Sequence, residues 1–370
     1  METKKYRFDE VTINFDKKRI PLSSAQREKR QGMFRYYGAQ GVIDHVDDYI
    51  FEGTYLLIAE DGENLKSKKQ NIAQVVDGQF WVNNHAHIVQ GNEQCDTRFL
   101  CYLINSMDLS GYITGSAQPK LSQANLNAVT LSLPTLAEQK RIVEYLYMLD
   151  QKIDVNRQIN DNLAVLLQTI YQDRFGNDIL AVNQGVLSDI CSYSRDKVAV
   201  SELNVSTYFS TENMLSEKAG STEATSLPTT SQTTACHKGD TLISNIRPYF
   251  KKIVYCEGNC GCSTDVLCFT PSQPRYSTYL FSTLYADKFF AFMVAGSKGT
   301  KMPRGDKQQI MTYPVVLPSE EELAGFNTIA SPLLKQIYSN RAENKRLSIL
   351  RDTLLPKLMS GEIDVSAVQL

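Results

Sequence analysis

The chain has 370 residues, with 39 lysines and arginines against 41 aspartates and glutamates, and a formal net charge of -2. This length exceeds what one ordinary hydrophobic core supports, so we expect two domains with connecting elements. The composition, 42% hydrophobic and 22% charged, is typical of a globular protein, and the near-neutral charge excludes a uniformly basic nucleic-acid binder. Any basic binding surface must therefore be local.

The N-terminal segment METKKYRFDE lacks the apolar core of a signal peptide, and no apolar run reaches the roughly 18 residues that cross a bilayer. We therefore expect a cytoplasmic protein without a membrane segment. Eight cysteines in such a chain are most simply reduced thiols. Cys256, Cys260, Cys262 and Cys268 follow one another closely. Their spacing suits a strand and turn with buried thiols better than a zinc site, which pairs its ligands as C-x2-4-C.

The chain contains an internal repeat. Residues 8–23 align with residues 187–202 at an offset of 179, and GSAQPKL from Gly115 aligns with GSKGTKM from Gly296 at an offset of 181. The helical stretches that include residues 138 and 322 align at an offset of 184. Offsets that drift by only a few residues indicate a tandem duplication with small loop insertions in the second copy.

Each copy begins with short β-rich runs separated by Gly, Asn and Asp turns, such as GTYLLIAE from Gly53 and GDTLISNI from Gly239. We expect globular domains with mixed sheet at residues 1–134 and 177–318. Each copy then continues into a long helical segment, a central one at residues 135–176 and a C-terminal one at 319–370.

Both helical segments start with the same signal. Thr135 is followed by Glu138, and Ser319 by Glu322, so each start has a hydroxyl and a carboxylate three residues later, the pattern of a capping box. Few helix breakers follow in the first copy. The second copy contains Pro332, where we expect the helix to break and restart with proline in its first turn.

Apolar residues repeat along one side of the first helix at alternating steps of four and three, but Asn156 and Asn160 occupy the two central positions. The repeat places Asn340 and Asn344 at the same points of the second helix. Because a stripe with this period needs a partner helix, we expect an antiparallel coiled coil with Asn156 near Asn344 and Asn160 near Asn340. Paired amides would disfavour slipped registers. Alternatively, the stripe turns to the surface at mid-helix.

A rigid helix pair of this kind would hold two similar domains at a fixed separation, as a pseudo-twofold internal repeat. The sequence contains none of the patterns GxxxxGK[ST], HExxH and GxSxG, and no GxGxxG follows a strand. His85 and His87 are the best candidates for catalysis or metal binding, on one face of a strand, but no matching carboxylate or cysteine is evident. A structural or binding-face role suits them better, and neither copy offers a convincing catalyst.

Local charge is uneven, because residues 1–40 contain ten basic against five acidic side chains. Basic residues interleaved with tyrosine and glycine in loops are suited to phosphate contact and base reading, although each run could also be only a solvated face. The residues expected to contact DNA are Lys17, Lys18, Arg35, Tyr36, Tyr37, Gln118 and Lys120 in the first domain and Lys197, Arg247, Tyr249, Lys298, Lys301 and Arg304 in the second.

The helical segment LPTLAEQKRIVEYLYMLDQKIDVNRQINDNLAVLLQTIYQDRF, from Leu133, and LRDTLLPKLMSGEIDV, from Leu350, resemble the specificity subunit of type I restriction-modification systems. The stretch YYGAQGVIDHVDDYIFEGTYLLIAEDG, from Tyr36, resembles the target recognition domains of that family. The resemblance implies an α+β fold: two tandem mixed α/β target recognition domains separated by two long helices packed as an antiparallel coiled coil.

The resemblance also implies a non-catalytic, DNA-binding subunit, each of whose domains reads one half of a split double-stranded DNA target. Its partners would be two methyltransferase subunits, which modify adenine, and motor-nuclease subunits. S-adenosylmethionine, ATP and Mg would be bound by those partners and not by this chain. Docking on the helices would use apolar residues outside the seam, such as Val143, Tyr145 and Val165. Alternatives are a stand-alone enzyme with two catalytic domains and a scaffold that binds two protein partners through its heads.

Overall fold

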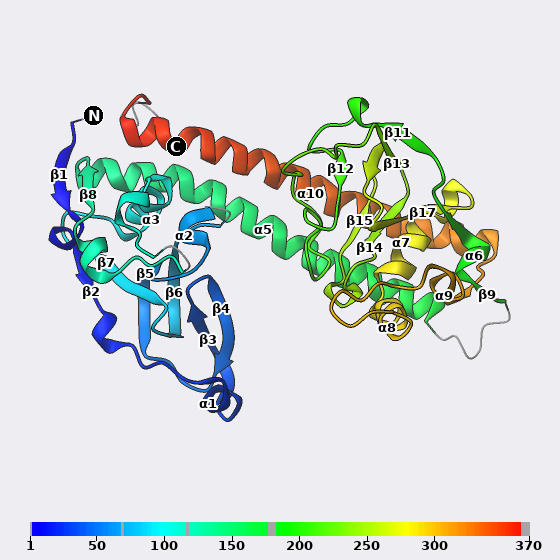
Figure 1. Cartoon of the computed structure of the whole chain (residues 1–370), viewed down its shortest axis with the longest axis horizontal. Coiled ribbons are helices and arrows are strands. Elements are labelled where there is room, and N and C mark those ends of the chain that lie inside the picture. Colours follow the sequence, from blue (N-terminus) through cyan, green and yellow to red (C-terminus); the bar gives the residue numbers. More distant parts are fainter. Residues whose placement is uncertain (1, 68–69, 116–117, 177–182, 364–370) are drawn as a thin grey trace. The chain divides into compact units, whose positions relative to one another are not determined.

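The computed structural model describes residues 2–67, 70–115, 118–176 and 183–363. The chain divides into two compact units, unit 1 from Met1–Ile153 with Lys345–Leu370 and unit 2 from Asp154–Asn344. The division crosses both long helices, α5 (Leu136–Phe175) and α10 (Glu320–Ser360), whose ribbons are labelled in Figure 1. The expected domain start at 177, the tail from 364 and two residues of GSAQPKL lie outside the described residues.

Unit 1 contains head one, residues 2–134, built on a six-stranded sheet of order β2-β7-β5-β6-β3-β4 and a two-stranded ribbon of β1 and β8. Its strands are β1 Lys4–Arg7, β2 Thr12–Asn14, β3 Gln31–Gly38, β4 Gly41–Val46, β5 Phe51–Ala59, β6 Ala73–Val82, β7 Ala86–Gly91 and β8 Thr130–Leu133. Its helices are α1 Ser24–Glu28, α2 Asn64–Ser67, α3 Thr97–Ser106 and α4 Gln123–Asn127, with 3-10 turns η1 Phe8–Glu10, η2 Asp16–Lys18 and η3 Ser110–Tyr112.

Side chains of β5 are buried on both faces of this sheet, because successive side chains of a strand point to opposite sides. Leu56 and Ile58 join the core that contains Phe99 of α3, and Leu57 joins an aromatic cluster with Phe80 on the other face. Burial on both faces explains why this strand reads as the continuous apolar run LLIA.

Unit 2 contains head two, residues 183–318, with two four-stranded sheets of order β10-β17-β14-β15 and β11-β13-β16-β12 and a ribbon of β9 and β18. Its strands are β9 Gln184–Val186, β10 Cys191–Tyr193, β11 Lys197–Ala199, β12 Tyr208–Phe209, β13 Gln232–Cys236, β14 Thr241–Ser244, β15 Ile253–Tyr255, β16 Cys260–Cys262, β17 Val266–Pro271 and β18 Pro314–Val316. Its helices are α6 Leu187–Ile190, α7 Ser277–Tyr285, α8 Asp287–Ala295 and α9 Lys307–Ile310, with 3-10 turns η4 Val200–Glu202, η5 Pro248–Phe250 and η6 Pro274–Tyr276.

The two heads repeat the same strand order, which confirms the predicted duplication. In head one, β2, β7, β5 and β6 are neighbours in that sequence, and β10, β17, β14 and β15 are neighbours in head two. Registers match as well: Leu57 lies opposite Ile88, and Leu242 lies opposite Cys268. The copies differ in what is added, since β3 and β4 extend the sheet of head one while head two forms a separate second sheet.

Both long helices begin with the predicted capping boxes. The Thr135 amide donates to Glu138 Oε2 at 2.9 Å, and the Glu138 amide donates to Thr135 Oγ1 at 3.4 Å. The Ser319 amide donates to Glu322 Oε2 at 2.8 Å, and the Glu322 amide donates to Ser319 Oγ at 3.3 Å. These bonds lower the pKa of the Glu322 carboxyl, since its charged form accepts them. Two amides that lack helical partners are thus satisfied at each start.

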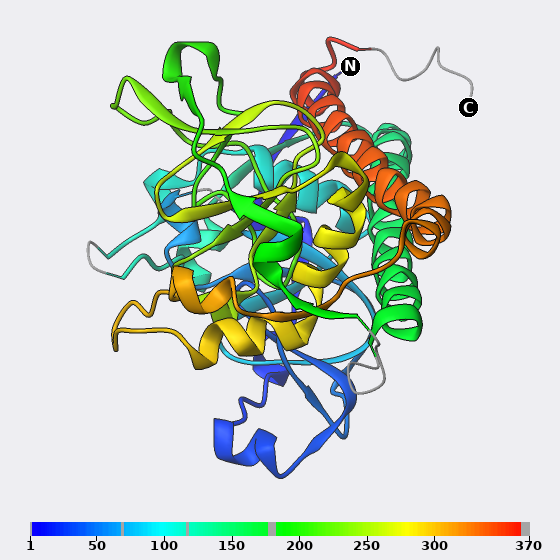
Figure 2. The same cartoon turned by 90° about the vertical axis from the view of Figure 1, so that its right-hand side faces the viewer.

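The two helices pack against each other antiparallel within each unit. In unit 1, Ile142 of α5 shares a core with Leu358 of α10, and in unit 2 Leu167 shares a core with Phe326. Both views show the two ribbons of unit 2 side by side (Figures 1 and 2). The antiparallel helix pair predicted from the sequence is therefore present.

The predicted break at Pro332 is wrong, because α10 is continuous from Glu320 to Ser360. Proline removes the helical hydrogen bond to the carbonyl four residues earlier, that of Thr328. Both Pro332 and Thr328 lie on the exposed side of the helix, where water can bond to that carbonyl. On the opposite side, buried Ala330 and Leu334 keep the helix packed before and after the proline.

Replacing Pro332 with alanine should therefore stabilise the protein. The substitution restores a helical amide without removing a buried contact, so we expect the free energy of unfolding to rise by about 1–3 kcal/mol, measured by denaturant titration. As a control, Lys335→Ala on the same exposed side should change it by less than about 0.5 kcal/mol. A loss of stability in Pro332→Ala would show that the ring makes contacts that the helix needs.

Candidate nucleic-acid interface and helix seam

We call the contact face between α5 and α10 the seam. Its four asparagines, Asn156, Asn160, Asn340 and Asn344, lie together in unit 2. Asn156 Nδ2 donates to Asn344 Oδ1 at 2.8 Å and to Glu343 Oε2 at 2.7 Å. Asn340 Nδ2 donates to Asn160 Oδ1 at 2.9 Å, and Asn160 Nδ2 donates to the Ile337 carbonyl at 3.1 Å. The structure thus places Asn156 against Asn344 and Asn160 against Asn340.

Three of the four asparagine side chains are buried, and Asn344 is partly buried. Asn156 is 1% exposed, and Asn160 and Asn340 are also buried. Buried amides cost free energy unless each finds a partner, and here each makes a hydrogen bond across the seam. Sliding one helix by about two turns would separate both pairs and leave amides facing apolar side chains such as Leu167 or Leu334.

In head one, the predicted basic residues Lys17 and Lys18 lie exposed on η2, and Lys120 and Gln118 lie exposed in a hairpin that pairs Thr114 with Lys120. Arg19, next to η2, places Nη1 3.0 Å from Glu60 Oε2, and Lys120 Nζ lies 3.3 Å from Glu60 Oε1. Glu60 therefore holds the turn and the hairpin together, and the predicted residues of both segments lie in one region.

Beneath this region lies a buried ion pair. His87 Nδ1 is 2.6 Å from Asp16 Oδ2, and His87 Nε2 is 2.8 Å from the Leu121 carbonyl. Both ring nitrogens face acceptors, so both carry protons and the imidazole is charged. Burial alone would lower the pKa of His87, but the bonds to Asp16 and Leu121 and the charges of Asp16 and Glu60 outweigh it, so the pKa is raised.

Asp16 responds in the opposite direction. Burial would raise the pKa of its carboxyl, but the hydrogen bonds from His87 and from the Ile88 amide, at 2.8 Å, outweigh burial and lower it. The pair anchors η2, and with it Lys17 and Lys18, to β7.

The expectation for the two histidines needs correction. Both have a carboxylate partner, since His85 Nδ1 lies 2.7 Å from Asp61 Oδ2. They also do not share a strand face, because His85 lies in the turn before β7 and is 51% exposed in its side chain, whereas His87 is buried. Sequence spacing could not show these partners, which lie 24 and 71 residues away.

Two of the predicted DNA contacts are core residues, which corrects that prediction. Tyr36 is fully buried, and its hydroxyl accepts a bond from the Leu22 amide at 2.9 Å. Tyr37 is buried against Phe80. Alternation along β3 turns Arg35 outward, where its Nη2 donates to the Asp77 carbonyl at 2.7 Å. Of this run, only Arg35 is available at the surface.

In head two, several predicted residues meet at one hairpin. Lys298 pairs with Arg304, and Arg304 also pairs with Ile246, the residue before Arg247. Lys301 is exposed in the hairpin, and Tyr249 is 47% exposed in η5. The outlying member is Lys197, exposed on β11 in the other sheet.

The hairpins of the two heads are equivalent and correct the predicted alignment. Thr114 pairs with Lys120 as Lys298 pairs with Arg304, and both turns contain a glycine with positive φ, Gly115 at 84° and Gly299 at 101°. Gly115 therefore corresponds to Gly299, at an offset of 184, and not to Gly296. A shared Gly-Ser pair misled the sequence alignment.

The hairpin cations differ in what already neutralises them. Arg304 Nη2 lies 2.9 Å from Asp265 Oδ1, Lys298 Nζ lies 2.5 Å from Asp306 Oδ2, and Lys120 contacts Glu60. Sequence reasoning missed Arg19, Glu60 and Asp265, which set this local charge. The sequence does not show which carboxylate pairs with which cation, because the partners Glu60 and Asp265 lie 60 and 39 residues from Lys120 and Arg304.

The cysteines form a buried thiol cluster. Cys256, Cys260, Cys262 and Cys268 are buried, as predicted, together with Cys236, and Cys260 Sγ lies 3.5 Å from Cys256 Sγ. The strands around them do not form one hairpin, since β15 pairs with β14 whereas β16 pairs with β12 and β13. Within the described residues, no three His, Cys, Asp or Glu side chains are placed to hold a metal ion.

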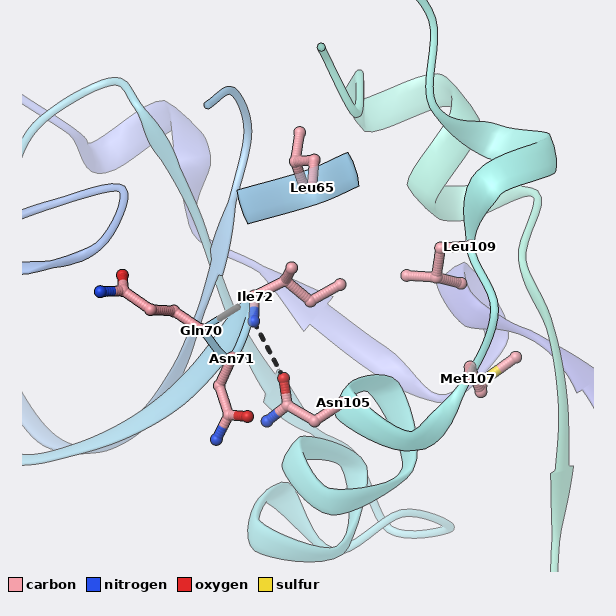
Figure 3. Close-up of a pocket in the computed structure, with 7 residues that line it drawn as sticks. All are labelled: Leu65, Gln70, Asn71, Ile72, Asn105, Met107 and Leu109. Carbon is pink, nitrogen blue, oxygen red and sulfur yellow. Dashed lines mark hydrogen bonds between the residues drawn. The ribbon is translucent and has the colours of Figure 1, made fainter. Parts of the chain in front are cut away.

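Unit 1 contains a small pocket of about 50 Å³, and Figure 3 shows the residues that line it. Asn105 lies on one side of it and accepts a bond at Oδ1 from the Ile72 amide at 3.1 Å. Leu65 and Leu109 line the apolar side. The pocket has room for about one or two water molecules and is too small for a nucleobase.

The comparisons with known proteins agree with this architecture. Residues 2–164 match the family described as Type I restriction modification DNA specificity domain. A Haemophilus influenzae protein named as a type I restriction enzyme specificity subunit is 36% identical over 138 residues, 37% of this chain and 35% of the relative. The Escherichia coli EcoprrI specificity subunit is 25% identical over 125 residues, 34% of this chain and 30% of the relative. The matches thus span about a third of these relatives' lengths.

Among solved structures, the S subunit of a type I restriction-modification system from M. genitalium superposes with a TM-score of 0.57 at 15% identity, covering 97% of this chain and 96% of that chain. The class of protein is therefore a two-headed α+β protein with a helix pair, the fold of a type I specificity subunit. At the level of sequence, the likeness to type I restriction-modification DNA specificity domains covers residues 2–164. In the described part of the chain, no helix is long and apolar enough to cross a membrane.

Stability should depend on pH through the pair of His87 and Asp16. The raised pKa of His87 gives stabilisation that is complete below about pH 6.5 and is lost as pH rises through the folded-state pKa. The lowered pKa of Asp16 gives stabilisation present above about pH 3.8 and lost as pH falls through its folded-state pKa. Denaturant unfolding should therefore show a loss of stability from pH 6 to pH 9.

Leu267 lies opposite Ile243 in head two as His87 lies opposite Ile58 in head one, so leucine is the equivalent residue. His87→Leu should cost about 3 kcal/mol at pH 6 because it leaves a buried carboxylate without its main partner. Its stability should then fall less between pH 6 and pH 9 than that of the wild type. The control variant His85→Leu should lose as much stability between pH 6 and pH 9 as the wild type does. If the free energy of unfolding of His87→Leu changes with pH as steeply as that of the wild type, His87 and Asp16 do not form a charged pair.

The amide seam predicts coupled substitutions. Asn160→Leu alone should cost about 1–3 kcal/mol, because Asn340 Nδ2 loses its acceptor in a buried site. The double variant Asn160→Leu with Asn340→Leu should recover most of this loss, since two leucines can pack together. Thermal and denaturant unfolding of the wild type, the single variants and the double variant complete this double-mutant cycle. Asn162→Leu, on the exposed side of the helix, serves as a control. Additive losses in the double variant would mean that the amides act independently.

Proposed function

We propose that the chain is the DNA-specificity subunit of a type I restriction-modification enzyme, in which each head reads one half of a bipartite double-stranded target. The observation that carries the proposal is the repeated hairpin of the two heads. Each hairpin places a basic side chain, Lys120 or Arg304, beside a loop whose amide bonds to a proline carbonyl, Pro119 or Pro303. The match of residues 2–164 to the specificity domain supports it.

In this proposal, the contacting residues include Lys17, Lys18, Arg35, Gln118 and Lys120 in head one. In head two they are Lys197, Arg247, Tyr249, Lys298, Lys301 and Arg304. Exposed lysines without an ion pair among the described residues, such as Lys17 and Lys301, suit phosphate contact. The turn and the hairpin tip each bring such a lysine to the surface, which supports local binding despite the overall charge of -2.

The helix pair sets the spacer between the two half-sites, and the four asparagines fix its register. Residues 135–176 and 319–370 act as spacer helices, and residues 1–134 and 177–318 act as recognition domains. Each hydrogen-bonded amide pair stabilises one alignment of the two helices over the others, as polar residues do at the helix contact of coiled coils.

Partner methyltransferase subunits dock on the helices. Val155, Ile159 and Leu166 lie exposed along one side of α5 in unit 2 at helical spacing, and Val165 is 67% exposed beside them. Exposed apolar side chains in such a row are suited to a protein interface. Val143, expected for this role, is buried in the core of unit 1 and is not available.

The chain itself is non-catalytic in this proposal. Two methyltransferase subunits use S-adenosylmethionine to modify adenine, and motor-nuclease subunits use ATP and Mg to cut unmodified DNA. Since these reactions act on host and invading DNA, the complex works in the cytoplasm.

Lengthening the helix pair should change the target spacer alone. One heptad is inserted after Asp150 in α5 and another before Arg351 in α10, at positions that face each other, with Arg351 Nη1 2.6 Å from Asp150 Oδ1. Seven residues add about 10 Å, close to three base pairs. Sequencing of methylated DNA should show the same two half-sites with a longer gap.

A heptad in α5 alone is the matched control. It should lower thermal stability, because the seam partners no longer coincide. If the paired insertion instead changes a half-site and leaves the gap unaltered, the proposed role of the helices is wrong.

A further inference from the structure

Backbone strain gathers at one place in head two. Among the described residues, the non-glycine residues with positive φ are Glu217 at 52°, Lys218 at 61°, Arg247 at 51° and Lys251 at 50°. This left-handed conformation is unfavourable for residues with a Cβ atom. Strain of this kind persists only where the surrounding structure imposes it, and it concentrates at functional sites.

The four residues belong to two segments that bind each other. The Glu217 amide donates to the Phe250 carbonyl at 2.9 Å, and the Lys218 amide donates to the Lys251 carbonyl at 3.0 Å. Both lysines also place Nζ 2.9 Å from Asp287 Oδ1. The loop from Arg247 to Lys251 is therefore braced at its far end by a second strained segment and a shared carboxylate.

Arg247 stands at the near end of this loop. Its amide donates to the Pro303 carbonyl at 2.8 Å, which ties the loop to the basic hairpin. Its Nε atom is buried and has no hydrogen-bond partner, and nothing in the described part of the chain forms an ion pair with its guanidinium. Its neighbours Arg304 and Lys298 both have carboxylate partners. Arg247 thus has a backbone that is held in place and a guanidinium charge without an acidic partner among the described residues, whereas the neighbouring cations Arg304 and Lys298 are each paired with a carboxylate.

Head one has glycine at the same place. The Gly62 amide donates to the Pro119 carbonyl at 3.3 Å, as the Arg247 amide does to Pro303, and Gly62 has a φ of 123°. Glycine adopts positive φ without the Cβ penalty. The second copy therefore holds an arginine where the backbone favours glycine, and within the described residues no hydrogen bond or ion pair of its side chain offsets the strain.

Resting on the proposed function, we propose that Arg247 is the specificity-determining residue of head two and reads a guanine through the N7 and O6 acceptors on its major-groove edge. A guanidinium offers two parallel donors that match this edge, whereas lysine offers a single point charge. Tyr249, two residues on and exposed, contacts the adjoining backbone of the same half-site. Head one, with Gly62, reads its half-site without a counterpart of this arginine.

The test selects bound sequences from a pool of random duplex DNA, using the full chain assembled with its methyltransferase subunits. The variants are Arg247→Lys, which keeps the charge but loses the fork, and Arg247→Gly, which installs the residue of head one. The matched control is Lys301→Ala in the neighbouring hairpin.

In both Arg247 variants, the preference for guanine at one position of one half-site should fall roughly 5- to 150-fold, the range for one bidentate contact. The other half-site should not change. Lys301→Ala should weaken binding to all sequences alike. Arg247→Gly should melt no lower than the wild type, which shows that it folds.

Unaltered half-sites in both Arg247 variants would overturn the inference while leaving the proposed function intact, as would a wild-type target without guanine in the affected half-site. If the wild-type complex selects no bipartite sequence, the proposed function itself fails.

Discussion

A 40-residue helix with an apolar stripe cannot leave that stripe in water, and the pairing of α5 with α10 is the constraint on which the rest of the structure depends. Each head builds its core directly on its part of this pair. Phe99 of head one shares a core with Leu146, and Tyr279 of head two packs against Tyr171 at 5.7 Å between ring centroids. A shift in helix register would therefore disturb both cores, and the buried amides add a directional penalty that apolar packing alone does not supply.

Duplication explains how one framework can carry two different recognition surfaces. Strand order and capping boxes are common to both copies, because they position the loops and do not contact a ligand in the proposed function. The backbone pairing of the hairpin is common as well, whereas its side chains differ. The copies differ beside the hairpins. His87 corresponds to Leu267 and Gly62 to Arg247, so head one has a buried ion pair under the turn η2 that head two lacks, and head two has a strained loop after β14 where head one has Gly62. In the proposed function, the two heads would differ in target because of such local differences and not because of the shared fold.

Periodic features of the sequence predicted the long elements well. Capping residues, the apolar stripe and the repeated asparagines are local or strictly periodic signals, and they predicted the helix starts and the antiparallel pair. Single loop residues could not be placed in this way. Tyr36 and Tyr37 follow a basic run, yet strand pairing buries both, and Pro332 continues a helix because its exposed side allows the missing bond. The partners of His87 and the strain at Arg247 arise from contacts between distant segments, which one sequence does not reveal.

In the proposed function, this chain selects a bipartite DNA target for partner methyltransferases. The most direct test of this selection is sequencing of methylated adenines in a host with the gene and in the same host after its deletion. If the chain selects a bipartite target, adenines should be methylated at two short half-sites separated by a fixed nonspecific gap, and only when the chain is expressed. Methylation that is identical in both strains, or that depends on the chain but lies in one continuous motif, would contradict it.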